Sequence, residues 1–374
     1  MFLTNRKQAI FVLLLLVALL VSACGGGGAG RSGDDGASES PDTTKSGKQE
    51  KVTLRVINWK DYGSDDTELV GQFEELYNVK IEHQYMASEE ELLTQLRIAK
   101  EGTIDLVLPN ASILPAAIEE GLLQEIDVTQ LSNYDSIYAP FKSLKENVKD
   151  GKVYAVPWVW GSTAIAYNPD KIQEPIRSIH ALWDEKYKGR IAFRDDFNDA
   201  IMTAAIALGQ DPNAPSDLDA ILNKLLEQKP LNRTYWKTGD EFSKLYAGDM
   251  VDIGLMWSGQ TATMKQEGLS IRYVIPDEGA IGWVDNWAIP KGSKNSELAH
   301  KFIDFLISKE FQEAWVNKGG PAPVNKNVST SLDPAFVEEM GLNEAAIEKL
   351  YFISYHTPDE KEQWNEIWQK VKAQ

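Results

Sequence analysis

Strand-like and helix-like patterns alternate along this chain from residue 52 onward, and no other feature limits its fold as strongly. Apolar residues alternate with polar ones in 52–56, as in a half-buried strand, and recur at helical spacing in 68–77. A second strand and helix pattern follows in 79–82 and 88–96, and 104–108 is a continuous apolar run typical of a buried parallel strand. This alternation predicts an α/β fold with helices on both faces of a parallel sheet. Ligands of such sheets bind beyond the carboxyl ends of the strands, so we expect functional side chains there.

Residues 1–23 are interpreted as a lipoprotein signal peptide. Arg6 and Lys7 give a positive start, and 9–21 is almost wholly apolar but too short for a comfortable membrane span. The segment ends in Val-Ser-Ala before Cys24, the only cysteine in the chain, and this resembles the bacterial lipobox, whose cysteine is lipidated. We therefore expect a lipid on Cys24 and an extracytoplasmic location at the membrane.

Composition separates a tether from a folded body and limits the possible partners. Residues 24–50 are rich in Gly, Ser, Asp, Thr and Lys, so they predict a flexible tether before a body long enough for two domains. The formal net charge is −18, and removal of the signal peptide would take away two positive charges and no acid. Such a surface argues against nucleic acid and anionic lipid as partners and is compatible with a cationic ligand. With one cysteine, disulfides play no part in the fold.

The segment 281–290, Ile-Gly-Trp-Val-Asp-Asn-Trp-Ala-Ile-Pro, combines an indole with a carboxylate. Trp283 and Asp285 are two residues apart, so in an extended strand their side chains share one face. A carboxylate beside an aromatic face suits an organic ammonium ion, which gains a charge partner and a cation–π contact. The alternative interpretation is that Trp283 belongs to the core and Asp285 is a surface residue at a strand end.

Other candidates follow other predicted strands. They are Trp59, Tyr62, Asp196, Asp199 and Trp257. Asp196 and Asp199 lie at a turn from a strand into an apolar helix, three residues apart, which places them on one helix face near its positive end. That location favours ionised carboxylates, and it is equally typical of residues that only cap a helix.

Five motifs, taken in order, resemble the polyamine-binding proteins of bacterial ABC importers, the spermidine/putrescine receptors among the solute-binding proteins. The motifs are Asn58-Trp59-Lys60-Asp61-Tyr62, Pro157-Trp158-Val159-Trp160-Gly161, Asp195-Asp196-Phe197-Asn198-Asp199, Gly254-Leu255-Met256-Trp257 and Trp283-Val284-Asp285-Asn286-Trp287-Ala288-Ile289-Pro290. The resemblance covers the whole mature body. It implies an α/β, two-lobed type II periplasmic-binding-protein fold with the ligand in a cleft between the lobes.

The resemblance also implies roles for the candidate residues. We assign 51–160 and 286–325 to lobe 1, and 161–285 and 326–374 to lobe 2. Trp59 and Tyr62 would come from lobe 1, and Asp196, Asp199 and Trp257 from lobe 2. Trp283 and Asp285 would lie at the crossing between the lobes. The indoles would sandwich the methylene chain of a polyamine, and the three carboxylates would pair its ammonium groups.

The same resemblance implies partners and excludes others. We expect permease subunits of an ABC transporter as partners, a monomer, no cofactor, no metal and no enzymatic activity. Lys60 departs from the small or polar residue usual at its position, and Asn110 and Ser112 stand where the family has an aromatic wall. The sequence Gly319-Gly320-Pro321 lacks a family tyrosine. These departures leave open which amine is bound.

Two alternatives follow from the residues themselves. The first is a receptor for another solute on the same fold, such as a different amine, an amino acid or a sugar. The second is a surface hydrolase with Asp196 and Asp285 as an acid/base pair. The sequence lacks the zinc-protease, nucleophile-elbow and phosphate-loop motifs. Its four histidines, expected at the surface, have no metal-like spacing; they are His83, His180, His300 and His356.

Overall fold

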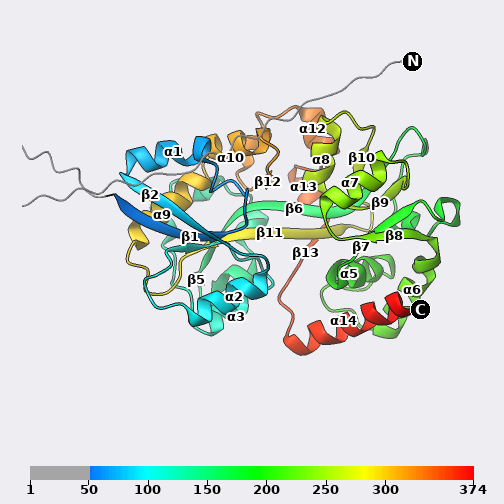
Figure 1. Cartoon of the computed structure of the whole chain (residues 1–374), viewed down its shortest axis with the longest axis horizontal. Helices are drawn as coiled ribbons and strands as arrows, with labels where there is room; N and C mark the ends of the chain where they lie inside the picture. Colours follow the sequence, from blue (N-terminus) through cyan, green and yellow to red (C-terminus); the bar gives the residue numbers. More distant parts are fainter. Residues whose placement is uncertain (1–50) are drawn as a thin grey trace, which may run out of the picture. The chain divides into compact units, whose positions relative to one another are not determined.

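A mixed sheet of eleven strands runs through the computed structural model, which describes residues 51–374 (Figure 1). The main path through this sheet is β2 (Val79–Tyr85), β1 (Val52–Asn58), β3 (Leu106–Val107), β11 (Ala280–Ala288), β6 (Ala155–Tyr167), β9 (Ile253–Trp257), β7 (Ile191–Arg194) and β8 (Asn232–Trp236). Three strands join it at the side: β10 (Arg272–Val274), β12 (Ala322–Pro323) and β13 (Leu350–Phe352). A separate hairpin consists of β4 (Val148–Lys149) and β5 (Lys152–Val153).

The two ends of the main path are parallel, and its centre is antiparallel. β1 pairs in parallel with β2 and β3, and β7 pairs in parallel with β8 and β9. Between them, β6 runs antiparallel to both β11 and β9. β6 has 13 residues, all of them buried, and in Figure 1 it crosses the centre beside β11. The long β6–β11 pair therefore connects two parallel α/β parts.

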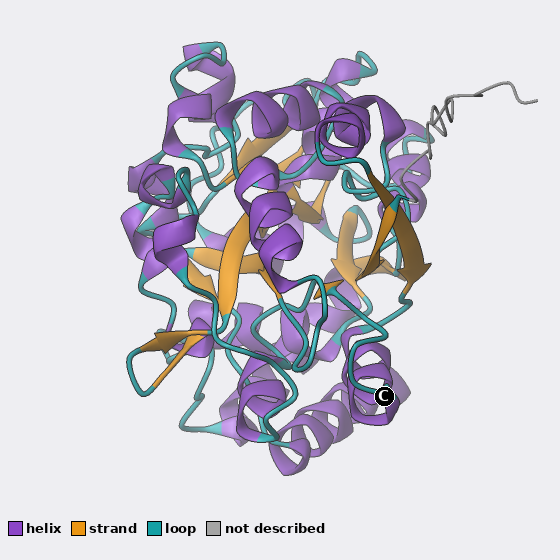
Figure 2. Ribbon diagram, turned by 90° about the vertical axis from the view of Figure 1, so that its left-hand side faces the viewer, coloured by secondary structure: helices purple, strands orange, loops and turns teal. Residues whose placement is uncertain are grey.

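Helices cover both sides of the strands, as the alternation predicts (Figure 2). Around the β1 end lie α1 (Thr67–Leu76), α2 (Glu89–Ile98), α3 (Leu114–Glu119), α4 (Ala139–Lys142), α9 (Ser296–Leu306), α10 (Lys309–Asn317) and α11 (Lys326–Ser329). Around the β7 end lie α5 (Phe197–Ala207), α6 (Leu218–Gln228), α7 (Gly239–Ala247), α8 (Ser258–Gln266), α12 (Pro334–Glu339), α13 (Glu344–Ile347) and α14 (Pro358–Ala373). The short 3-10 helices are η1 (Val128–Gln130), η2 (Tyr134–Ser136), η3 (Lys145–Asn147), η4 (Ile179–Trp183), η5 (Glu185–Tyr187) and η6 (Lys229–Leu231).

Side-chain caps fix the starts of the two helices that matter most for the site. The hydroxyl of Ser88 accepts a hydrogen bond from the backbone N–H of Glu91 at 3.1 Å, so α2 begins with Glu89. The carboxylate of Asp196 accepts from the N–H groups of Asn198 and Asp199, so α5 begins directly after β7. Both caps satisfy donors that a helix start leaves without partners.

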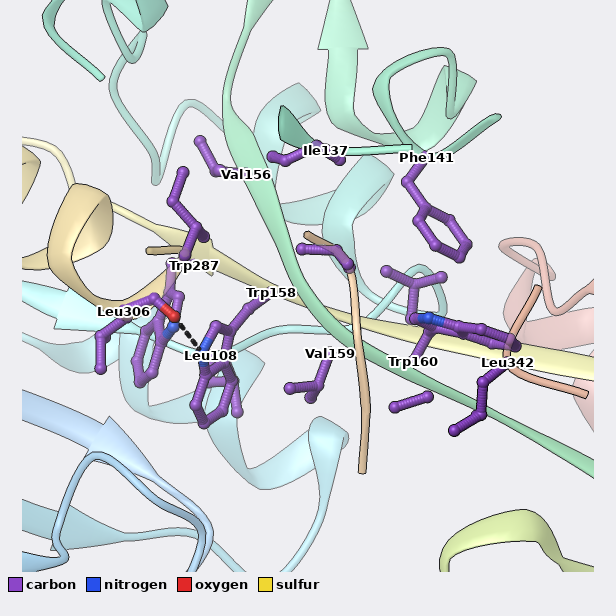
Figure 3. Packing of buried hydrophobic residues seen from close by; sticks show 14 of the residues in the cluster. Leu108, Ile137, Phe141, Val156, Trp158, Val159, Trp160, Trp287, Leu306 and Leu342 are labelled. Carbon is purple, nitrogen blue, oxygen red and sulfur yellow. Dashed lines mark hydrogen bonds between the residues drawn. The ribbon is translucent and has the colours of Figure 1, made fainter. Parts of the chain in front are cut away.

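Three tryptophans of the sequence motifs belong to the hydrophobic core. Trp158, Trp160 and Trp287 are almost completely buried, and Figure 3 shows their rings packed beside β6. The indole N–H of Trp158 donates to the carbonyl of Leu306 at 3.0 Å, and that of Trp160 donates to the carbonyl of Pro323 at 2.8 Å. These bonds satisfy the buried indole N–H groups of Trp158 and Trp160, whereas the N–H of Trp287 is buried without a partner among the described residues.

Some expectations from the sequence differ from the structure. The apolar run 104–108 forms only the two-residue strand β3. His300 and His356 are buried, at 5% and 4% exposure, rather than at the surface. The His300 Nδ1 lies 2.7 Å from the Ser296 carbonyl, and its Nε2 accepts from the Asp127 N–H, so both ring nitrogens have partners inside.

The predicted signal peptide, Cys24 and the tether lie outside the described residues. Within 51–374, none of the helices combines the length and the apolar character that crossing a membrane requires. Residues 50–374 form a compact unit of their own.

Candidate functional site

Asp285 is a buried carboxylate in the middle of β11. The hydroxyl of Tyr62, from the loop after β1, donates to Asp285 Oδ2 at 2.7 Å, and Oδ1 accepts no hydrogen bond from the described residues. Asp285 is only 7% exposed, which contradicts the interpretation of a surface residue at a strand end. Burial raises the pKa of Asp285 to about 6, and the Tyr62 hydrogen bond acts against this rise.

Two tryptophan rings pack against Tyr62, whose hydroxyl donates to Asp285. Its ring packs edge-on against Trp158, at 5.6 Å between centroids, and against Trp315, at 6.4 Å. Burial, together with the charge of Asp285, raises the pKa of Tyr62 well above its usual value. The hydroxyl therefore keeps its proton and remains a donor.

Glu89, the first residue of α2, brings a second buried carboxylate to this place. Its Oε2 accepts from the N–H of Asn110 at 3.1 Å, and Asn110 forms an antiparallel bridge with Asp285. Glu89 is 8% exposed, and its Oε1 is buried without a hydrogen-bond partner. Burial, and then the charge of Asp285, raise the pKa of Glu89 well above its usual value. We call Tyr62, Glu89 and Asp285 the carboxylate end.

Sequence reasoning missed Glu89. The pattern from Ser88 to Glu91 is typical of a capped helix start, where acids in the first turn have an ordinary structural role. The signal that could have found Glu89 is its position. It follows β2 within a few residues, where a parallel sheet gathers its functional side chains.

Trp283 lies flat across β6 on the same face as Asp285. The strand register pairs Trp283 with Gly161, and a Cβ atom added to Gly161 would lie 2.1 Å from the indole Cζ2. Only glycine leaves room for the ring at this position. Trp283 is partly exposed and is separated from Asp285 by one residue of β11, so the predicted shared face is present.

Trp257 lies on the same face of the sheet as Trp283, on the other side of β6, and an arginine of the protein already contacts its ring. The register pairs Trp257 with Thr163, two residues along β6 from Gly161. The Arg194 guanidinium carbon lies 4.9 Å from the centroid of the Trp257 ring, within cation–π range. Sequence reasoning did not predict this contact.

Arg194 also binds both predicted carboxylates of α5. Its Nη1 donates to Asp199 Oδ2 at 2.9 Å, and its Nη2 lies 3.6 Å from Asp196 Oδ2. Asp199 is only 1% exposed, and burial raises its pKa against the opposing effect of Arg194. Asp196 additionally caps α5, so the capping interpretation is correct for this residue. We call Arg194, Asp196, Asp199 and Trp257 the arginine end.

The structure thus groups five of the seven predicted residues in the two clusters: Tyr62 and Asp285 at the carboxylate end, and Asp196, Asp199 and Trp257 at the arginine end. A sixth, Trp283, lies on the face of β11 that also carries Asp285. The seventh, Trp59, is partly exposed and packs against the core; none of the hydrogen bonds, ion pairs or ring contacts in 51–374 joins its side chain to the others. Lys60 is exposed. Within the same residues, no three His, Cys, Asp or Glu side chains are placed to hold a metal ion.

The comparisons with known proteins begin with the fold. A spermidine/putrescine ABC transporter substrate-binding protein, PotD, from Streptococcus pneumoniae superposes with a TM-score of 0.77 at 23% identity, over 86% of this chain and 99% of that chain. The sheet of this chain therefore has the type II periplasmic-binding-protein fold, which is an α/β fold with two lobes.

The sequence comparisons give the family. Residues 68–343 match the bacterial extracellular solute-binding proteins, and the chain belongs to this family. The spermidine/putrescine-binding periplasmic protein of Escherichia coli is 31% identical over 68% of this chain and 72% of that protein. The putrescine-binding periplasmic protein PotF of the same organism is 27% identical over 87% of this chain and 92% of that protein. These matches confirm the resemblance that the five motifs indicate. The family consists of binding proteins and not of enzymes, so the hydrolase alternative is excluded.

Proposed function

We propose that this protein captures a polyamine, spermidine or putrescine, and delivers it to the permease of an ABC importer. The observation that carries the proposal is Asp285, a buried carboxylate with an unpaired oxygen beside the partly exposed indole of Trp283. An ammonium ion that leaves water needs a carboxylate or another acceptor, and an indole face attracts it further. The relatives named for spermidine and putrescine support the same class of ligand.

The ligand would lie in a cleft between two lobes. We propose residues 51–160 with 286–325 as lobe 1, and 161–285 with 326–374 as lobe 2. The two parallel parts of the sheet, connected by β6 and β11, support this division. Trp59 and Tyr62 then belong to lobe 1, whereas the arginine end belongs to lobe 2. Closure by a hinge between such lobes is the usual way in which binding proteins enclose a ligand.

Micromolar binding needs about 8 kcal/mol net, and the proposed contacts can be compared with that figure. Each methylene group that moves from water onto an indole contributes about 0.8 kcal/mol. A cation–π contact adds about 0.5 to 2 kcal/mol. A charge-assisted hydrogen bond to Asp285 contributes about 1.5 to 3 kcal/mol. Four methylenes, two such contacts and one such bond add up to about 6 to 10 kcal/mol before the entropic cost of association is subtracted.

We also propose the location and the partners. The signal-like segment 1–23 and Cys24 support a lipid anchor on the outer face of the cell membrane or in the periplasmic space. Permease subunits in that membrane would recognise the closed, loaded form. We propose that the receptor works as a monomer, because one chain supplies both lobes.

Thermal unfolding of the compact unit with and without candidate solutes tests this function. Putrescine, spermidine and spermine should each raise the unfolding temperature, since a ligand at about 100 times its Kd adds about 2.7 kcal/mol to the free energy of unfolding. Sugars and neutral amino acids should have no effect. The variant Asp285→Asn should lose the polyamine effect. The absence of any rise with all three polyamines would contradict the proposal.

A further inference from the structure

A buried acceptor without a partner is rare in native proteins, and Glu89 Oε1 is one. The other oxygen of the same carboxylate has an ordinary structural role, because it accepts from the Asn110 N–H. Holding the chain at Asn110 needs only that one oxygen. The burial of the second oxygen therefore costs free energy that the unliganded fold does not regain.

The surroundings of Glu89 contain acids and a hydroxyl but no cation that pairs with it. Asp285 forms a bridge with Asn110, whose N–H donates to Glu89, and the charge of Asp285 acts on both Glu89 and Tyr62. Neither Glu89 nor Asp285 forms an ion pair with a Lys, Arg or His of the described residues. Lys361, a cation whose charge acts on Glu89, pairs instead with the neighbouring Glu90, at 3.2 Å. Two buried carboxylates that interact and have no paired cation favour sharing one proton.

The arginine end differs in this respect. Asp196 and Asp199 have the Arg194 guanidinium as a resident partner, and Arg194 also covers Trp257. Glu89 and Asp285 therefore lack the resident cation that Asp196 and Asp199 have. An incoming cation meets an uncompensated acceptor pair at the carboxylate end.

We infer that Glu89 is a further ligand-binding residue, which together with Asp285 holds one ammonium group of the solute and gives up a shared proton when that group enters. The inference rests on the proposed function. Glu89 Oε1 and Asp285 Oδ1 accept two of the three N–H donors of the ammonium. The free pair has one proton and one negative charge; the loaded pair has two negative charges and the ammonium, and the proton goes to solvent. Binding at this site is thus an exchange of an ammonium for a proton.

Calorimetric titration with putrescine near pH 7, in two buffers of different ionisation enthalpy, measures both the affinity and the number of protons released. Putrescine keeps both of its own protons at this pH, so any released proton comes from the protein. We expect the wild-type unit to release up to about one proton for each putrescine bound. Glu89→Gln should weaken binding about tenfold or more and release fewer protons. Glu75→Gln, an exposed acid on α1, is the control and should change neither quantity.

The outcomes separate this inference from the proposed function. If the wild-type unit binds neither putrescine nor spermidine, the proposed function fails, and the inference fails with it. If the wild type binds and Glu89→Gln binds equally well with the same proton release, the inference alone is overturned. If Glu89→Gln does not fold, titration of the wild type still tests the inference. Binding to the wild type without proton release between pH 6 and pH 8 would refute a shared proton.

Discussion

Replacing Asp285 by Asn should stabilise the unliganded protein and at the same time weaken solute binding. Burial raises the pKa of Asp285 from 3.8 to about 6. At about 1.36 kcal/mol for each pH unit, that difference corresponds to about 3 kcal/mol. Because the folded-state pKa lies above the unfolded one, Asp285 lowers the free energy of unfolding as the pH rises from about 4 to above 6, and the full loss is present at pH 8. An amide carries no charge and still accepts the Tyr62 hydrogen bond, so the variant avoids this loss.

Urea unfolding without ligand measures the effect. Asp285→Asn should exceed the wild type by about 3 kcal/mol at pH 8, and the difference should shrink below pH 6 and nearly vanish at pH 4. Removing the charge of Asp285 also lowers the pKa of Glu89, which acts in the same direction. Asp170→Asn, at an exposed aspartate, is the control and should leave the free energy of unfolding at pH 8 close to that of the wild type.

Two results would refute this reasoning. A variant that is less stable than the wild type at pH 8 would mean that the fold needs the Asp285 charge. A difference that stays constant from pH 4 to pH 8 would mean that Asp285 does not titrate in this range, so its burial would have no electrostatic cost.

Three further predictions concern other parts of the site and the core. In calorimetric titration, Gly161→Ala should weaken putrescine binding about tenfold, because the added methyl group displaces the indole of Trp283. Gly71→Ala, where the added methyl group meets no atom within 4 Å, is the control and should bind normally. Equal binding by both variants would contradict the placement of Trp283. Arg194→Gln should raise the affinity for spermidine relative to putrescine about tenfold in the same titration, because the arginine end then lacks its own cation. An unchanged ratio of the two affinities would mean that the arginine end does not contact the ligand. Trp160→Ala should lower the free energy of unfolding by about 3 to 5 kcal/mol in urea, and a loss below about 1 kcal/mol would show that the ring is not packed as described.

The parts of the fold that the sequence predicts are those set by local patterns. The alternation in 52–56 and the helical spacing in 68–77 correspond to β1 and α1, because each pattern is the direct consequence of one buried face. The shared face of Trp283 and Asp285 follows in the same way from the two-residue period of a strand. β13 could not be predicted, since its pairing with β11 joins segments about 70 residues apart.

The candidate site shows the same limit. Motif order pointed to Tyr62 and Asp285, but their hydrogen bond joins residues 223 positions apart and no local pattern records it. Glu89 could not be recognised from the sequence, because acids are common in the first turn of a helix, where they interact favourably with its positive end. Arg194 could not be recognised either, because its role depends on contacts that the fold brings together. It forms ion pairs with Asp196 and Asp199 at α5 and a cation–π contact with Trp257 at the end of β9. Sequence patterns indicate which residue types are present; only the fold decides which charges are already paired.

Calorimetric titration of putrescine and spermidine into the compact unit and its Asp285→Asn variant tests the central claim most directly. We predict saturable binding of one polyamine to the wild type, and a loss of about tenfold or more in the variant, because one ammonium then lacks its charged partner. Equal affinity in both proteins, or no binding to the wild type, would contradict the assignment of Asp285 as the centre of a polyamine site.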